Sequence, residues 1–90
     1  MVFLIQQKKN EKNIKLHKID LVAASQVFYG YHIVFQPCNT REPYTLIGLL
    51  EGIEVVVVFL KNGQNITTLS ARRALSNERR RFWAAYRKQR

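Results

Sequence analysis

Residues 53–73 read IEVVVVFLKNGQNITTLSARR, and they predict two adjacent strands and the turn between them. The near-continuous apolar run Ile53–Leu60 is typical of a central strand that is covered on both faces, or on one face by helices. Asn62-Gly63 is a strong signal for a two-residue hairpin turn, because both residues tolerate the positive φ angles of such turns. A second strand is predicted over Ile66–Ala71. The stretch therefore predicts a hairpin within an antiparallel sheet.

The sequence on either side extends this hairpin into a three-strand meander followed by a helix. A strand over Pro43–Leu50 is joined to the hairpin by a turn at Glu51-Gly52. Ser76 is expected to cap a final helix that runs to about Tyr86. The C-terminal half is thus predicted to be strand, strand, strand and helix.

The N-terminal half is predicted to be mainly helical. A short strand over Val2–Ile5 precedes a helix over Gln6–His17, which is rich in good helix formers. Asp20 is placed to cap a second helix over Leu21–Phe28, and residues 31–35 have strand-forming side chains without a firm assignment. The expected fold is α+β, with a small antiparallel sheet made of the meander and the N-terminal strand and with helices packed at its ends.

The composition predicts a single domain over residues 1–90. Of these residues 47% are apolar and 23% are charged, as in ordinary globular proteins. The longest apolar run is far below the ~20 residues that a membrane span needs, and the apolar start Met1–Ile5 is too short for a secretory signal. A lone cysteine, Cys38, excludes an internal disulfide and a multi-cysteine zinc site. We expect a cytoplasmic protein without a membrane partner.

Positive charge is concentrated at the two ends of the chain. The sequence has 15 Lys and Arg against 6 Asp and Glu, which gives a net charge of +9. Residues 8–18 hold five lysines and Glu11, and residues 71–90 hold seven arginines and Lys88 against Glu78. Such blocks attract nucleic acid or an acidic protein with strong salt dependence, although a basic tail can also serve solubility alone.

A set of residues along nearly the whole chain resembles the BrnT family of toxins. In the first half they are Phe3, Lys9, Asn13, His17, Ile19, Ala24, Val27 and Phe28. In the second half they are Arg41, Ile47-Gly48, Val55–Val58, the run Leu69–Ala74, Glu78-Arg79 and Tyr86. The most specific piece is the ending Ser-Ala-Arg-x-Ala-x-x-x-Glu-Arg at residues 70–79.

The resemblance implies a RelE-like fold and an endoribonuclease toxin of a type II toxin–antitoxin pair. Its partners would be RNA and a tightly bound antitoxin that neutralises it. The chain departs from the family pattern at four positions, where Ile5-Gln6 replace Trp-Asp, Leu16 replaces Lys and Lys18 replaces Gly. The lost carboxylate and lysine keep a second reading open, a catalytically weakened module that binds RNA or antitoxin.

Metal-independent RNA cleavage needs a group that activates a 2′-hydroxyl and cations that stabilise the phosphoryl transition state. His17 is the candidate base or acid because its side chain titrates near neutral pH, and Lys9 on the same helix face gives electrostatic support. Arg41 and Arg72 are the candidates that hold the phosphate. Glu78 is either a general base or a structural partner of an arginine. No metal or other cofactor is expected.

Further side chains are candidates for holding the RNA strand. They are Lys15, Arg73, Arg79, Arg80 and Tyr86. Arg73, Arg80 and Arg87 are seven residues apart and are expected to form one stripe on the last helix. Tyr86 and Trp83 can stack on bases, but aromatic residues at helical spacing also serve as core. A third reading, in which the basic C-terminal helix binds an anionic membrane, is the weakest.

Overall fold

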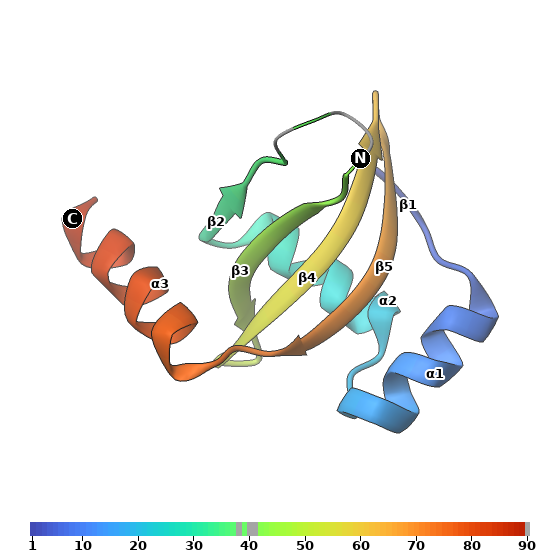
Figure 1. The fold of residues 1–90 in the computed structure, drawn as a ribbon, viewed down its shortest axis with the longest axis horizontal. Helices are drawn as coiled ribbons and strands as arrows, with labels where there is room; N and C mark the ends of the chain where they lie inside the picture. The colour runs from blue at the N-terminus through green and yellow to red at the C-terminus, as the bar shows by residue number, and fades with distance from the viewer. Residues whose placement is uncertain (38, 40–41, 90) are drawn as a thin grey trace.

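The computed structural model describes residues 1–37, 39 and 42–89, and it has an α+β fold (Figure 1). Five strands form one mixed sheet in the order β1-β5-β4-β3-β2. The strands are β1 Val2–Leu4, β2 His32–Phe35, β3 Tyr44–Leu50, β4 Ile53–Asn62 and β5 Asn65–Arg73. The helices are α1 Gln7–His17, α2 Leu21–Ala24 with the 3-10 turn η1 Ser25–Tyr29, and α3 Ser76–Lys88. The predicted fold class is confirmed.

The predicted meander is present, with its hairpin turn shifted by one residue. Asn62 pairs with Asn65, so the two turn residues are Gly63-Gln64 and not Asn62-Gly63. Gly63 has a φ of 61°, a left-handed conformation in which a residue without Cβ is not strained. The glycine therefore takes the first position of the turn, and β4 extends two residues beyond the predicted end at Leu60.

The sheet is larger than predicted and is not purely antiparallel. Residues 32–35 form β2, which pairs antiparallel with β3 at the edge of the sheet. The N-terminal strand β1 runs parallel to β5, with Val2 opposite Asn65 and Leu4 opposite Thr67. Strand direction depends on how the chain returns to the sheet, and hydrophobic patterning does not encode it.

Central strand β4 is covered on both faces, as its run of valines predicts. Val55 and Val57 face a core built with α2 and η1, which we call the α2 face. Val56 faces the opposite side, the α3 face, where it joins Ile47 and Phe82. All three valines are almost completely buried. The register between β4 and β5 then decides the face to which each side chain of β5 points. Arg73 lies opposite Val55 on the α2 face, and Arg72 lies opposite Val56 on the α3 face.

Helix α1 is joined to the edge of β5 by one side chain. The Asn13 amide donates to the Ala71 carbonyl (2.9 Å) and accepts from the Ala71 N–H (3.0 Å), as a neighbouring strand would. It also donates to the Ile19 carbonyl (2.8 Å), and Asn13 is only 4% exposed. Ile14, one position along, is half exposed at the helix surface. The buried seam of α1 is therefore polar.

Asp20 begins α2 as predicted, because its carboxylate accepts the Val22 N–H at 2.9 Å. The same carboxylate accepts the Asn10 amide, and the Asn10 carbonyl accepts the Leu21 N–H. These bonds tie α1 to α2. No helix over the described ranges is long and apolar enough to cross a bilayer.

Replacing Asn13 with alanine is expected to lower the free energy of unfolding by about 2–4 kcal/mol, because the buried Ala71 and Ile19 groups lose their partner. Urea denaturation followed by circular dichroism measures the loss. Asn62→Ala, at the exposed end of β4, is the control and should change stability by less than about 0.5 kcal/mol. Equal stability of the Asn13 variant and the control would contradict this role for Asn13.

Candidate nucleic-acid interface

Lys9, Asn13 and His17 lie on one face of α1, as their four-residue spacing predicts. While Asn13 docks on β5, the side chains of Lys9 and His17 flank it and line a groove of about 300 Å³. Lys12 and Leu16 complete the helix side of this groove, and Leu69 and Ser70 of β5 form its other wall. We call it the α1 groove. It brings two lysines and one histidine to the sheet edge.

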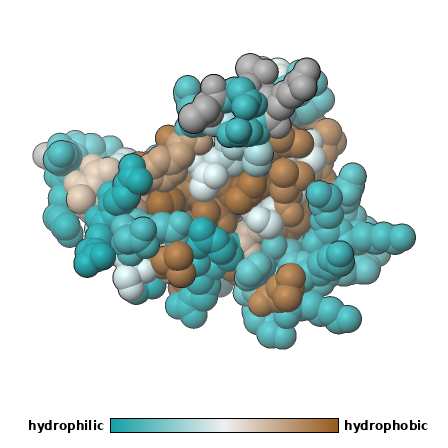
Figure 2. Space-filling view, viewed as in Figure 1, coloured by the Kyte–Doolittle hydropathy of each residue, from teal (hydrophilic) through white to brown (hydrophobic). Residues whose placement is uncertain are grey.

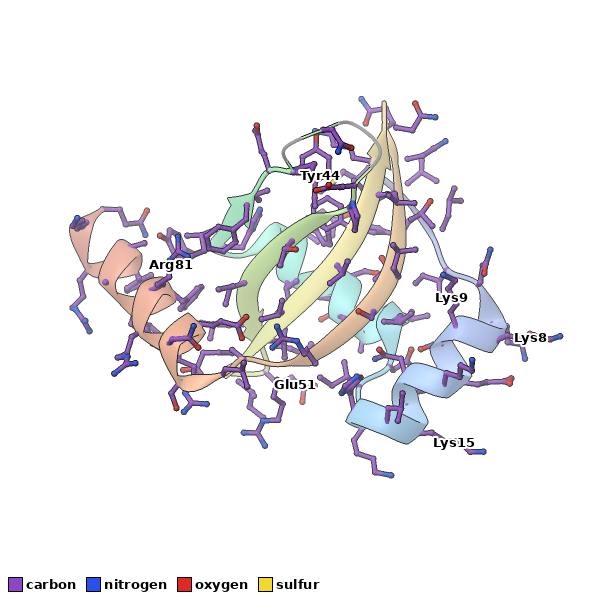
Figure 3. The ribbon with its side chains drawn as sticks, viewed as in Figure 1. Lys8, Lys9, Lys15, Tyr44, Glu51 and Arg81 are labelled. Carbon is purple, nitrogen blue, oxygen red and sulfur yellow. The ribbon has the colours of Figure 1, made fainter. Side chains whose placement is uncertain are left out.

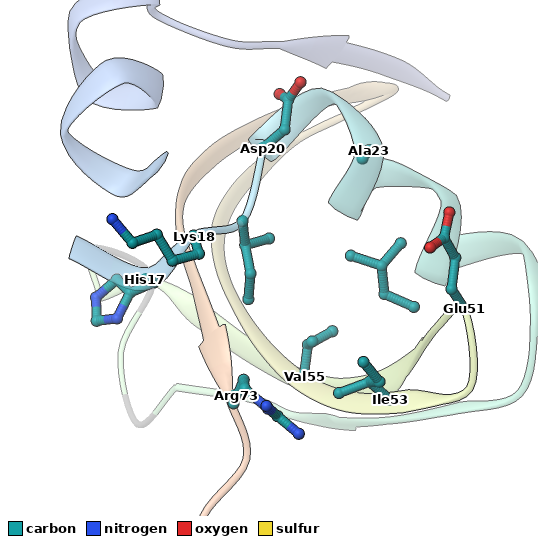
Figure 4. A pocket seen from close by; sticks show the side chains of 10 residues that line it. His17, Lys18, Asp20, Ala23, Glu51, Ile53, Val55 and Arg73 are labelled. Carbon is teal, nitrogen blue, oxygen red and sulfur yellow. The ribbon is translucent and has the colours of Figure 1, made fainter. Parts of the chain in front are cut away.

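A second hollow, of about 330 Å³, opens on the other side of His17. The side chains of His17, Lys18 and Arg73 line one side, and Glu51 lies opposite them (Figure 4). The floor is apolar, with Ile53 and Val55 of β4. We call it the β4 hollow. His17 therefore forms a ridge between two cation-lined depressions.

Lys18 and Glu51, which both line the β4 hollow, have left-handed backbone conformations with φ values of 60° and 51°. Among the described residues, these two are the non-glycine residues that have a positive φ angle. Lys18 ends α1, and its N–H bonds to the Ile14 carbonyl at 2.9 Å. The left-handed turn at Lys18 sends the chain from α1 directly into α2, with the lysine side chain at the rim of the hollow.

Two carboxylates near the interface accept internal hydrogen bonds. Bonds from the Asn10 amide and the Val22 N–H lower the pKa of Asp20. A 2.6 Å bond from the Trp83 indole lowers the pKa of Glu54, with smaller contributions from Arg79 and Arg73. Neither acid forms an ion pair with a described lysine of α1. The cations of the interface therefore face solvent with few counter-charges.

Arg72 and Glu78 bind each other across the α3 face. Two parallel hydrogen bonds of 2.8 and 2.9 Å join the guanidinium to the carboxylate. The pair raises the pKa of Arg72 and lowers that of Glu78. Glu78 also accepts the Leu75 N–H at 2.7 Å, so it closes the first turn of α3, which begins one residue after Leu75. Of the two roles that the sequence left open for Glu78, this is the structural one, a partner of an arginine, which its position among basic residues favoured.

The structure does not bring Arg72 together with His17. Arg72 lines neither the α1 groove nor the β4 hollow, because it points to the α3 face while Arg73 points to the α2 face. Arg73, and not Arg72, lines a hollow together with His17. Arg41 and Cys38 lie outside the described residues, and so does every expectation placed on them.

The remaining candidates are spread over other surfaces. Arg79 and Arg80 line a shallow notch on α3 together with Trp83 and Arg87. Arg73 belongs to β5, so the predicted stripe with Arg80 and Arg87 is wrong in its first member. Trp83 and Tyr86 pack edge-to-face on each other, and Tyr86 also packs on Tyr31.

Lys15 is an exposed residue in the last turn of α1 (Figure 3). Across the described part of the chain, no three His, Cys, Asp or Glu side chains gather as a metal site would require.

These features define a small basic α+β domain that presents cations and one histidine at a sheet edge. The family model described as "Ribonuclease toxin, BrnT, of type II toxin-antitoxin system" matches residues 6–78. The crystal structure of the Brucella abortus ribonuclease toxin BrnT superposes with a TM-score of 0.70 and 22% identity, over 84% of this chain and 100% of that chain. No curated protein matches.

The chain belongs to the BrnT family, the ribonuclease toxins of type II toxin–antitoxin systems. The matched segment runs from the residue before α1 to Glu78 in the first turn of α3, so it contains both depressions beside His17. The likeness to the Brucella protein supports the same fold.

Sequence reasoning missed Lys12, Lys18 and Glu51 as lining residues. The signal for Lys12 was present, since it lies three residues after Lys9 on the helix. Lys18 and Glu51 line the same hollow only because two turns in different parts of the chain converge, and no spacing in the sequence encodes that.

Glu78→Gln is expected to lower the free energy of unfolding at pH 7 by about 1–3 kcal/mol, since half-exposed Arg72 loses a bidentate partner. Because folding lowers the pKa of Glu78, its contribution is complete above the ordinary glutamate range near 4.3 and is lost as pH falls through the folded value.

Denaturation at a series of pH values measures both effects. The Glu78 variant should lose part of the acid sensitivity of the wild type and keep the part that comes from Asp20 and Glu54. Glu11→Gln on the exposed side of α1 is the control. A Glu78 variant with the stability and pH profile of the wild type would contradict the assignment.

Proposed function

We propose that this toxin cleaves single-stranded RNA at the ridge formed by His17. His17 lines both the α1 groove and the β4 hollow, and this position supports the proposal. A phosphodiester at the ridge has one flanking nucleotide on each side, and the two depressions provide for both. Because the proposed substrate is RNA and the proposed partner is a protein antitoxin, we expect the protein to act in the cytoplasm.

Cations stand on both sides of the ridge. Lys9 and Lys12 line the α1 groove, and Lys18 and Arg73 line the β4 hollow. Arg73 is exposed, and its guanidinium suits bidentate contact with a phosphate. The role that sequence reasoning gave to Arg72 therefore passes to Arg73 in this proposal, and the Arg72–Glu78 pair holds α3 on the sheet.

The proposed chemistry is metal-independent transesterification. Neutral His17 takes the proton of a 2′-hydroxyl, the 2′-oxygen attacks the adjacent phosphorus, and the P–O5′ bond breaks. The leaving 5′-oxygen takes a proton from solvent, so the products are a 2′,3′-cyclic phosphate and a 5′-hydroxyl. Lys9 and Arg73 stabilise the charge that develops on the phosphoryl oxygens.

A second candidate function is binding of RNA or antitoxin without hydrolysis. His17 is exposed and makes no hydrogen bond to another described residue that would fix its tautomer. Catalytic histidines are usually oriented by such a partner, and Gln6 and Leu16 stand where the resemblance has Asp and Lys. RNA that is retained in gel shifts but stays intact for hours would support this second function.

Replacing His17 with asparagine is expected to reduce RNA cleavage by about 10²–10⁴-fold, because proton transfer is lost while the polar side chain remains. The initial cleavage rate of a single-stranded RNA in the presence of EDTA measures it. His32→Asn is the control, since His32 lies on the opposite edge of the sheet in β2. Equal rates for the His17 variant and wild type would remove the proposed site.

RNA affinity should fall steeply with salt, and the slope should report the phosphate contacts. Lys9→Gln and Arg73→Gln are each expected to reduce the slope of log affinity against log salt by about 0.7, the value for one contact to a single strand. Lys61→Gln, at the far end of β4 from Arg73, is the control and should leave the slope unchanged. An equal change of the slope in all three variants would show that RNA affinity depends on the net charge of the protein and not on contacts at this site.

A further inference from the structure

The notch on α3 is a cationic depression of about 360 Å³ that the proposed cleavage at His17 does not use. Its lining residues come from α3 and from the start of β4, and they are Ser76, Arg79, Arg80, Trp83, Arg87 and Glu54. We call it the α3 notch. Figure 2 shows that hydrophilic side chains gather over α3, at the left of the view. Most of the lining residues lie beyond the matched segment 6–78, so the family match does not define this notch.

One face of α3 carries an aromatic ring between arginines. Trp83 follows Arg79 and Arg80 by one helical turn, and Arg87 follows Trp83 by one further turn. Arg80 and Arg87 are therefore two turns apart, or about 10 Å along the helix axis. Both are exposed, and neither forms an ion pair with another described residue. The helix thus presents cations before and after one indole ring.

The indole ring of Trp83 is held in one orientation. Its Nε1–H donates to the Glu54 carboxylate at 2.6 Å, and its ring packs edge-to-face on Phe82 and Tyr86. The same bond engages the one acid among the described lining residues of the notch. Trp83 is nevertheless only half-buried. A ring that is already fixed can stack on a base with little further loss of side-chain freedom.

The α3 notch and the β4 hollow share a rim at the start of β4 and the end of β5. Ile53 lines the hollow, and the next residue, Glu54, lines the notch. Arg73 also lines the hollow, and Ala74 follows it where β5 continues into α3 (Figure 1). Ala74 donates its N–H to the Glu54 carbonyl (3.0 Å) and accepts the Arg79 guanidinium (3.0 Å). A strand of RNA that leaves the hollow past Arg73 therefore reaches the notch.

We propose that the α3 notch is a second nucleotide subsite for the same RNA strand, with a base on Trp83 and phosphates on Arg80 and Arg87. This subsite rests on the proposed function, because it extends the strand whose cleaved phosphate lies at His17. Guanidinium groups suit phosphate oxygens, and an aromatic ring stacks on any base. An acidic peptide would engage the arginines alone and leave the ring between them unused. The notch therefore favours substrates that continue several nucleotides beyond the cleaved bond.

Trp83 is the single tryptophan of the chain, so its fluorescence reports directly on the notch. The probe is a 2′-O-methyl RNA of about twelve nucleotides, within the length range of single-stranded binding sites. Quenching of the indole fluorescence measures stacking, and anisotropy of a labelled copy measures affinity. Arg80→Gln and Arg87→Gln each remove one cation of the notch. Arg81→Gln is the matched control, because it makes the same charge change on the same helix, where the Arg81 guanidinium lies over the Phe35 ring at 4.5 Å. Thermal melting confirms that each variant is folded.

We expect the RNA to quench Trp83 in a saturable way. In about 0.1 M salt, Arg80→Gln and Arg87→Gln should each weaken binding about fivefold relative to Arg81→Gln, as the loss of one contact with a salt slope of about 0.7 implies. Unchanged Trp83 fluorescence, or equal affinities of the three arginine variants, would overturn the subsite. So would a polyglutamate of the same charge that binds as tightly as the RNA with the same dependence on Arg80 and Arg87, since it would assign the notch to an acidic protein.

The subsite and the nuclease can fail separately. His17→Asn should remove most of the cleavage and leave the quenching of Trp83 intact. Arg80→Gln should slow cleavage of a long RNA below saturation about fivefold and leave cleavage of a dinucleotide unchanged, because a dinucleotide at His17 does not reach the notch. Cleavage that depends on His17 without any quenching of Trp83 would count against the subsite alone. Quenching that depends on Arg80, by an RNA that is never cleaved, would support the subsite and count against the nuclease.

Discussion

The double hydrogen bond between the Asn13 amide and the Ala71 backbone is the interaction on which the rest of the structure depends. Strand β1 pairs with only the first residues of β5, so the remaining edge of β5 would be open. Asn13 closes that edge with the same donor and acceptor pattern that a strand would use. Because Lys9 and His17 lie one turn to either side of Asn13, the bond also fixes where their side chains lie.

Internal hydrogen bonds also engage three of the acidic side chains of the molecule. Asp20, Glu54 and Glu78 serve as a helix cap, a partner of the Trp83 indole and a partner of Arg72. These bonds hold carboxylates that could otherwise pair with the lysines and arginines at the two ends of the chain. Among the described residues, the lysines of α1 and Arg73 have no ion-pair partner, which agrees with the proposed binding of RNA.

Features that depend on local pattern could be predicted from the sequence, and those that depend on register could not. The valine run, the cap at Asp20 and the shared face of Lys9 and His17 follow from spacing along one element. Arg72 and Arg73 are adjacent in sequence, but the pairing of β5 with β4 sends them to opposite faces, and of the two only Arg73 lines the hollow that His17 also lines. The parallel direction of β1 and the lining of one hollow by both Lys18 and Glu51 likewise depend on how distant segments come together.

A nuclear magnetic resonance titration with a 2′-O-methyl RNA oligonucleotide, which cannot form the cyclic phosphate, tests whether RNA binds at His17. The imidazole signals of His17 should shift together with side-chain signals of Lys9 and Arg73, at one saturable site, while His32 stays unchanged. Shifts confined to the arginines of α3, with His17 unmoved, would show that RNA lies elsewhere and that the ridge is not its site.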